Sequence, residues 1–142
     1  MKPTVVIPIS LAALSARKTL GERPDVEIAL PTLACQALLY RLSGDYNPLH
    51  ADPHVAQLAG FPRPILHGLC TYGMAAHAVL KGVCGYAAER IRAVAVRFSA
   101  PVYPGETIQF QLWHRDSASL HLRARVDARD AVVLDNGVVE LC

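Results

Sequence analysis

A carboxylic acid, an amide and an imidazole lie together in one short segment of the chain. Asp45, Asn47 and His50 fall within six residues, and Gly44 and Pro48 beside them favour turns. A carboxylate and an imidazole at one dry site can divide a proton transfer between them when their pKa values differ. Loops between hydrophobic elements are typical places for such groups. We therefore expect Asp45 and His50 to act on one small molecule, for which water is the obvious candidate.

A second polar turn, His67-Gly68, begins the longest apolar segment of the chain. If that segment is helical, the backbone N–H of Gly68 lies at the positive end of a helix and can stabilise an oxyanion or an enolate. His67 is expected to brace the turn or to line the pocket. Asn47 is expected to orient a substrate group or to hold its own loop. The combination predicts acid–base chemistry beside a polarised carbonyl group.

Simpler interpretations exist for several polar residues. Asp, Asn and Gly are common turn residues, so a purely structural loop is an alternative for Asp45 and Asn47. Asp52 is expected only to cap a helix. The spacing of the His and Asp residues matches no common ligand pattern, so no metal site is predicted. The other histidines are expected at surface or half-exposed positions, and these are His54, His77, His114 and His121.

Hydrophobic periodicity indicates the elements that must position these residues. Alternation predicts a strand over residues 25–29. Apolar residues at helical spacing after Thr32, taken as the N-cap, predict a short helix that ends at Gly44. Asp52 followed by proline predicts the start of a second short helix, which Gly60 ends.

The later part of the chain changes from a helical period to a period of two. The apolar segment from Leu69 to about Val83 predicts a helix that is buried on both faces. Alternation then predicts strands around 94–98, 108–113, 119–126 and 132–141, the last one interrupted at Asp135-Asn136-Gly137, with turns at Pro104-Gly105 and Asp116-Ser117. One central helix followed by antiparallel strands predicts an α+β fold, with the helix packed on one curved sheet.

Length and composition limit the possible classes of protein. The chain has 142 residues, of which 52% are hydrophobic and 18% charged, so one folded domain is expected. We expect residues 1–23 to form an N-terminal arm and residues 24–142 to form the domain. The net charge of +2, without any basic run, argues against nucleic-acid binding.

The compartment can be predicted from the cysteines and from the absence of long apolar segments. The four cysteines form no CxxC pair and are interpreted as reduced thiols. No segment approaches the roughly 20 apolar residues that span a bilayer, and the N-terminus lacks the core of a signal peptide. A soluble, cytoplasmic protein with no membrane partner is therefore expected.

Two motifs in the chain resemble those of a known enzyme family. Residues 40–53 and 64–73 read YRLSGDYNPLHADP and PILHGLCTYG. They are similar to the hydratase 2 motif of R-specific enoyl-CoA hydratases, the MaoC-like branch of the hot-dog superfamily. Residues 97–107, RFSAPVYPGET, also resemble that family. The resemblance extends from about Pro24 to the C-terminus and implies a single hot-dog fold.

The resemblance implies a reaction and a role for each matched residue. Asp45 and His50 would hold and activate the water that adds to a trans-2-enoyl thioester, giving a (3R)-3-hydroxyacyl product. The N–H of Gly68 would bind the thioester carbonyl oxygen, and Asn47 would support the loop or the substrate. No cofactor is implied beyond the CoA of the acyl-CoA substrate.

Some enzymes of the family have two hot-dog domains, of which the second resembles this chain. Here only about 23 residues precede the matching region. We therefore expect two copies of the chain to pair their sheets as a homodimer. Three other functions remain open at this point: a hot-dog thioesterase, a dehydratase acting on an acyl-carrier-protein substrate, and a non-catalytic subunit that binds acyl thioesters.

Overall fold

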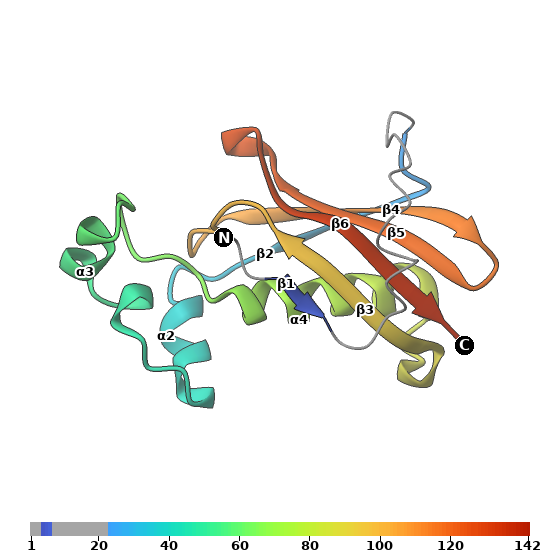
Figure 1. Cartoon of the computed structure of the whole chain (residues 1–142), viewed down its shortest axis with the longest axis horizontal. Helices are drawn as coiled ribbons and strands as arrows, with labels where there is room; N and C mark the ends of the chain where they lie inside the picture. The colour runs from blue at the N-terminus through green and yellow to red at the C-terminus, as the bar shows by residue number, and fades with distance from the viewer. Residues whose placement is uncertain (1–3, 7–22) are drawn as a thin grey trace.

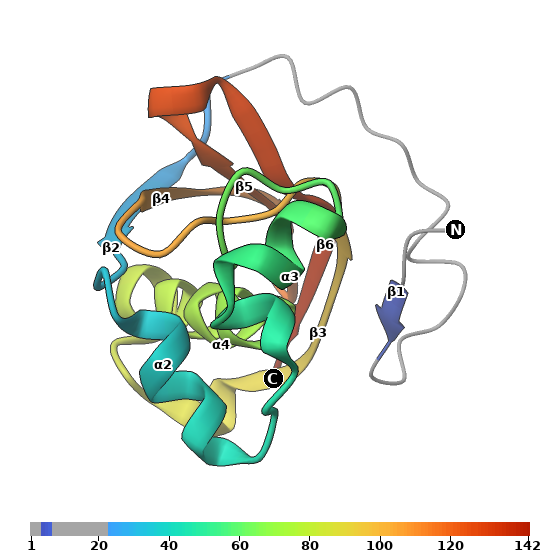
Figure 2. The same cartoon turned by 90° about the vertical axis from the view of Figure 1, so that its left-hand side faces the viewer.

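A curved antiparallel sheet holds one long helix against its concave face (Figures 1 and 2). This computed structural model describes residues 4–6 and 23–142. The strands are β1 (Thr4–Val6), β2 (Val26–Pro31), β3 (Ile91–Phe98), β4 (Thr107–Asp116), β5 (Ser119–Val126) and β6 (Ala131–Leu141), and the α-helices are α2 (Gln36–Tyr40), α3 (Pro53–Leu58) and α4 (Gly68–Val79). Their order in the sheet is β1-β3-β6-β5-β4-β2. The predicted α+β fold, with a helix on one curved sheet, is confirmed.

Helix α4 lies in the middle of the fold, but the prediction that both of its faces are buried is wrong, because Leu69 and His77 are exposed on the face turned away from the sheet. Ala75, Ala78 and Val79 are completely buried between the helix and the sheet. The helix continues as a π-helical turn over Leu80–Cys84, in which a Cβ at Gly82 would lie only 3.0 Å from the Val26 side chain. Small residues therefore allow the sheet to approach the helix closely along its length.

The predicted N-cap at Thr32 is wrong. The hydroxyl of Thr32 donates a hydrogen bond to the carbonyl of Glu106 (2.7 Å) and accepts one from the N–H of Gly105 (2.9 Å). It therefore fastens the end of β2 to a distant turn, and α2 begins only at Gln36. A 3-10 turn, Arg41–Ser43, follows α2, and Gly44 ends it with φ 117°, as predicted.

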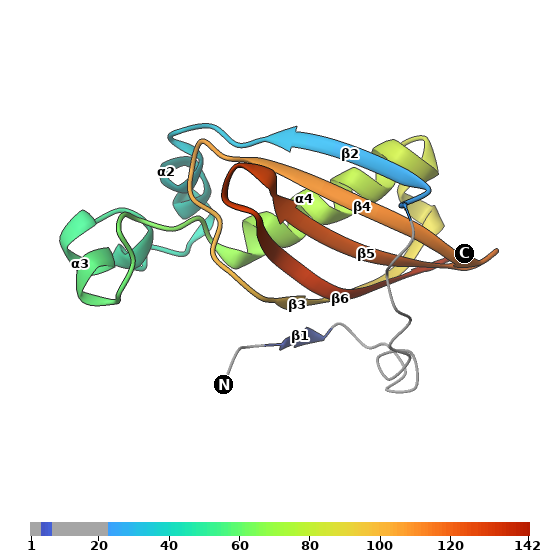
Figure 3. The ribbon, with the colours of Figure 1, turned by 90° about the horizontal axis from the view of Figure 1, so that it is seen from above.

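The second short helix begins as predicted. Asp52 is the N-cap of α3, and its carboxylate accepts hydrogen bonds from the N–H groups of His54 (2.8 Å) and Val55 (3.4 Å). Pro53 occupies the first helical position, where its missing N–H costs nothing. Gly60, with φ 87°, follows the end of the helix. Helices α2 and α3 both lie beyond one end of the sheet (Figure 3).

The predicted interruption of the last strand is wrong, because β6 is continuous from Ala131 to Leu141. Opposite Val96 of β3, β6 has two residues, Asn136 and Gly137, in place of one. This is a β-bulge, and Asn136 adopts φ 49° within it. Turn-forming residues in this strand therefore bend the sheet without ending the pairing.

The expected exposure of His121 is also wrong, since its side chain is only 7% exposed. His121 pairs with Trp113 across β5 and β4, and Trp113 is buried as well. The guanidinium of Arg123 lies over the Trp113 ring, 5.2 Å from its centroid. Alternation assigns a side chain to one face of a sheet, but it does not indicate how far large neighbours cover that face.

The predicted N-terminal arm, residues 1–23, lies outside the described residues except for Thr4–Val6 and Arg23. Strand β1 pairs antiparallel with residues 95–97 of β3. The division into an arm and a domain stays a prediction. Among the helices of the described residues, none has the length and apolar character required to cross a membrane.

We predict that Gly137→Ala destabilises the protein, because its Cβ would lie 2.4 Å from the carbonyl oxygen of Leu122. Overpacking of this kind costs about 1–3 kcal/mol, which urea denaturation can measure. Gly73→Ala is the matched control, since its Cβ would have nothing within 4 Å on α4, and it should be neutral or stabilising. Equal stability of the Gly137→Ala protein and the wild type would contradict the described bulge.

Candidate active site

An open cavity of about 430 Å³ lies at the N-terminal end of α4, the end next to α2 and α3. Most of its wall is apolar, and three side chains that can transfer protons, Asp45, His50 and His67, reach it. The remaining lining residues are Phe61, Ile65, Leu66, Gly68, Leu69, Thr71, Phe98, Ser99, Ala100, Pro101, Val102 and Val133. A long apolar group with one polar end fits such a cavity.

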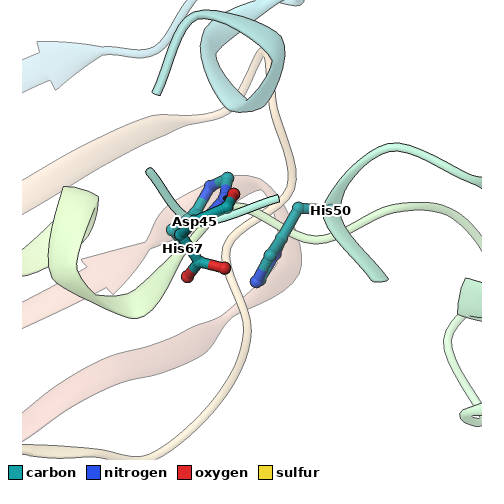
Figure 4. Close-up of side chains that lie close together, drawn as sticks. All are labelled: Asp45, His50 and His67. Atoms are coloured by element: carbon teal, nitrogen blue, oxygen red, sulfur yellow. Dashed lines mark hydrogen bonds between the residues drawn. The ribbon is translucent and has the colours of Figure 1, made fainter. Parts of the chain in front are cut away.

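The carboxylate of Asp45 and the ring of His50 lie side by side at this cavity (Figure 4). One ligand atom each of Asp45, His50 and His67 lies within 4.8 Å of the other two. A water molecule that hydrogen-bonds to two acceptors at ordinary distances holds them about 4.5 Å apart. Because 4.8 Å is the upper limit of these separations, Asp45 and His50 are close enough to share one water molecule.

The backbone fixes the orientation of the His50 ring. Nδ1 lies 2.8 Å from the carbonyl oxygen of Ile65. Because a carbonyl can only accept, Nδ1 carries a proton, so the neutral form of the ring has its lone pair on Nε2. A histidine held in this way has the tautomer that a general base requires.

Asn47 stabilises the loop between Asp45 and His50. Its side-chain oxygen accepts a hydrogen bond from the N–H of Leu49 (3.0 Å) and caps the 3-10 helix Pro48–His50. Its own N–H donates to Oδ1 of Asp45 (3.3 Å), which helps to orient that carboxylate. The loop-supporting role expected of Asn47 is therefore visible, and a contact with substrate stays a prediction.

Two backbone N–H groups at the start of α4 are free to bind an anion. The amides of Cys70 and Thr71 both donate to the carbonyl of His67. Within the described part of the chain, the amides of Gly68 and Leu69 donate to no acceptor, and both residues line the cavity. The sequence indicated Gly68 but not Leu69, although both belong to the first turn of the same helix.

His67 is the most buried polar residue at the cavity, with 1% of its surface exposed. Its Nε2 lies 3.1 Å from the backbone oxygen of Asp45, and its ring stacks on that of His50 with centroids 3.8 Å apart. Burial lowers the pKa of His67, and the neighbouring His50 lowers it further, against an opposing hydrogen bond to Asp45. The imidazole is therefore neutral at pH 7.

The same three residues do not form a good chelating site as they stand. The His50 and His67 rings are stacked at an interplanar angle of 26°. A metal ion binds an imidazole nitrogen along its lone pair, in the plane of the ring, at about 2.0–2.1 Å. Two nearly parallel rings cannot both direct a lone pair at one ion, so metal binding would require rearrangement.

The segment after β3 forms one wall of the cavity, a role that was not predicted from the sequence. Phe98 packs against the start of α4, where a Cβ at Gly68 would lie 3.2 Å from its ring. Residues 98–102 line the cavity. The available signal was the resemblance of residues 97–107 to the hydratase family.

Two arginines fasten this wall. The guanidinium groups of Arg63 and Arg129 lie 4.8 and 4.9 Å from the centroid of the Tyr103 ring. Arg129 also makes two hydrogen bonds to the carboxylate of Glu106, one of them 2.9 Å long. Although burial alone would raise it, the bonds from Arg129 and from the Tyr103 amide hold the pKa of Glu106 below its usual value.

Comparison with known proteins gives consistent similarities. The MaoC like domain family matches residues 15–136. The chain is 51% identical over 122 residues to 3-hydroxyacyl-thioester dehydratase Y of Mycobacterium tuberculosis, covering 82% of this chain and 42% of that protein. It is 50% identical over 103 residues to the peroxisomal enoyl-CoA hydratase 2 of Arabidopsis thaliana, covering 72% of this chain and 33% of that protein.

A solved structure shows the same fold. The MaoC-like dehydratase from Phytophthora capsici superposes with a TM-score of 0.85 at 43% identity, covering 88% of this chain and 44% of that one. This likeness confirms the predicted single hot-dog fold. The chain spans less than half the length of these relatives.

We predict that Glu106→Gln lowers the free energy of unfolding at pH 7 by about 1–3 kcal/mol, because it removes charged hydrogen bonds. The folded-state pKa of Glu106 lies below the ordinary 4.5. The stabilisation that the charged Glu106 carboxylate gives is therefore complete above pH 4.5. It is lost as the pH falls through the folded-state pKa. The difference in the free energy of unfolding between variant and wild type, measured by urea denaturation, should disappear at acid pH.

Glu89→Gln is the control for this prediction, because Glu89 is exposed, and its stability should match the wild type at every pH. A gap between the Glu106→Gln protein and the wild type that stays constant down to acid pH would show that the carboxylate charge is not responsible.

Proposed function

Because this chain belongs to the MaoC-like family, we propose that it hydrates trans-2-enoyl-CoA to (3R)-3-hydroxyacyl-CoA and catalyses the reverse dehydration. One observation supports this proposal above the others. Asp45 and His50 lie together at an apolar cavity beside the free N–H groups of Gly68 and Leu69. The names of the relatives, a thioester dehydratase and an enoyl-CoA hydratase, agree with it.

The proposed mechanism uses one water molecule and returns the enzyme unchanged. Asp45 and Nε2 of His50 hold the water, and the pair accepts a proton as the water oxygen attacks C3 of the substrate. Electrons move to the thioester oxygen, where the N–H groups of Gly68 and Leu69 stabilise the developing negative charge. The pair then returns a proton to C2, so that hydroxyl and hydrogen have added across the double bond.

The shape of the site supports an acyl-CoA substrate. The apolar wall around Phe98 and Val133 would accept the acyl chain. A second cavity of about 170 Å³ includes His50 and Arg63, and we propose Arg63 as a contact for a phosphate of CoA. We propose that no cofactor is required beyond the CoA of the substrate.

The active form is proposed to be a homodimer. Five large apolar side chains between residues 33 and 46 are at least half exposed, namely Leu33, Leu38, Leu39, Leu42 and Tyr46. Asp45 is itself exposed in the single chain. A second copy covering this surface would bury the leucines and exclude water from Asp45, which strengthens its interactions with substrate.

We also propose a reducing compartment, the cytoplasm being the simplest. Cys35, Cys70, Cys84 and Cys142 are all free thiols. Burial raises the pKa of Cys70, which makes this thiol unreactive.

We predict that Asp45→Asn and His50→Gln each lower kcat for crotonyl-CoA hydration by about 10²–10⁴-fold, because each removes one half of the proton-transfer pair. The loss of absorbance of the enoyl thioester measures the rate, and chiral analysis identifies the (3R) product. Circular dichroism should show an unchanged fold.

The controls are Asp52→Asn and His54→Gln, which change the same residue types on neighbouring exposed positions and should keep kcat. Substantial turnover by the Asp45→Asn or His50→Gln protein would falsify the assigned roles. Release of free CoA thiol by the wild type without hydration would instead identify a thioesterase.

We predict that Leu42→Glu dissociates the homodimer, because Leu42 is the most exposed of the five apolar side chains. Light scattering should give twice 15.4 kDa for the wild type and 15.4 kDa for the variant, with lower activity. Leu58→Glu is the control, since Leu58 is 76% exposed on α3 outside this surface and should leave the mass unchanged. A fully active wild-type monomer would exclude the dimer proposal.

A further inference from the structure

The reaction proposed above gives no task to His67, although His67 is the most buried titratable group at the site. Its backbone is the N-cap of α4, immediately before the free amides of Gly68 and Leu69. Its side chain contacts Asp45 and His50, which belong to a different segment of the chain. His67 is therefore the residue at which the separate parts of the site meet.

The hydrogen bond of His67 determines which tautomer it has. Nε2 lies 3.1 Å from the backbone oxygen of Asp45, which can only accept, so Nε2 carries the proton. Nδ1 is then an unprotonated nitrogen, and it is buried without a hydrogen-bond partner in the described part of the chain. Leaving a buried acceptor unpaired is unfavourable and calls for a compensating role.

The ring of His67 is enclosed by two other rings. On one side it stacks on His50 with centroids 3.8 Å apart, and Tyr40 of α2 lies tilted against it at 4.7 Å. His67 packs against the face of the His50 ring, and the carbonyl of Ile65 accepts a hydrogen bond at the edge of that ring. Together the two contacts leave His50 one orientation.

From these contacts we infer that His67 is a positioning residue, which sets the relative placement of Asp45, His50 and the start of α4 as a neutral imidazole with its proton on Nε2. Its N–H holds the backbone of Asp45, its ring supports the face of His50, and its own backbone begins the helix that offers the amides.

The charge state of His67 matters because of the groups that face it. These are Asp45 and His50 from the loop, Tyr40 from α2, and Arg41 from the following 3-10 turn. Burial lowers its pKa, and His50 and Arg41 lower it as well, while the contacts with Asp45 oppose them. A neutral His67 leaves His50 free to take up a proton during the reaction, whereas a charged one would repel it.

Two substitutions separate the contributions of the N–H group and of the ring. His67→Gln keeps an N–H donor near the position of Nε2, and His67→Phe keeps a ring but removes the donor. We expect His67→Phe to lower kcat for crotonyl-CoA by about ten- to hundredfold with an unchanged KM, as a small misplacement of catalytic groups does. His67→Gln should recover much of that loss.

The matched controls are His54→Gln and His54→Phe at an exposed position, which should keep the wild-type kcat and melting temperature. Equal kcat losses in the two His67 variants, or a change in KM alone, would overturn the positioning role. So would unchanged kinetics in His67→Phe.

Long-range ¹H–¹⁵N spectra of the wild-type histidines test the inference without any variant. We expect the imidazole of His67 to be neutral and protonated on Nε2 at pH 7, with its signals assigned by their absence from the His67→Gln spectrum or by sequential assignment. Protonation on Nδ1, or on both nitrogens, would overturn the inference. The kinetic consequence rests on the proposed function; if the wild type hydrates no enoyl-CoA, that function fails while the spectra still decide the tautomer.

Discussion

The close packing of α4 against the concave face of the sheet is the constraint on which the site depends. Ala75 and Ala78 have no exposed surface, and Gly82 leaves no room for a Cβ beneath β2. A helix enclosed in this way cannot slide or rotate without clashes. The first turn of α4 therefore has one fixed position, in which Gly68 packs against the Phe98 ring. The amides at that point are oriented before any ligand arrives, and this preorganisation is what makes backbone donors effective in catalysis.

The polar groups of the site come from a segment with little regular structure, and short-range hydrogen bonds hold it. Asn47 caps one helical turn and Asp52 caps the next, so that the chain between them has a defined course. Long-range contacts from Ile65 and His67 then fix the His50 ring against the core. Hydrogen bonds within the loop and contacts with the start of the central helix both restrain it. Such a loop can hold a carboxylate and an imidazole at a constant separation.

The parts of this structure that were predictable from sequence are those with a local physical cause. The alternating strands, the central helix, the cap at Asp52 and the stop at Gly44 each depend on residues close in the chain. The failures involve partners distant in sequence. Thr32 resembles a helix cap, but its hydroxyl bonds to a turn more than seventy residues away. The pairing of Asp45 and His50 could be expected from the motif, whereas the stack of His67 on His50 and the wall after β3 depend on tertiary packing.

The two edges of the sheet differ in a way that bears on self-association. Strand β2 forms one edge; it includes the acidic residue Glu27 and ends at Pro31, which has no N–H to donate to a further strand. At the other edge, within the residues that the structure describes, β1 pairs only with residues 95–97 of β3. A sheet with two open edges can add copies without limit and grow into a fibre. If copies of the chain pair through the other edge, the blunted β2 edge would stop that pairing at two copies, so the sequence of β2 disfavours growth of the sheet into a fibre.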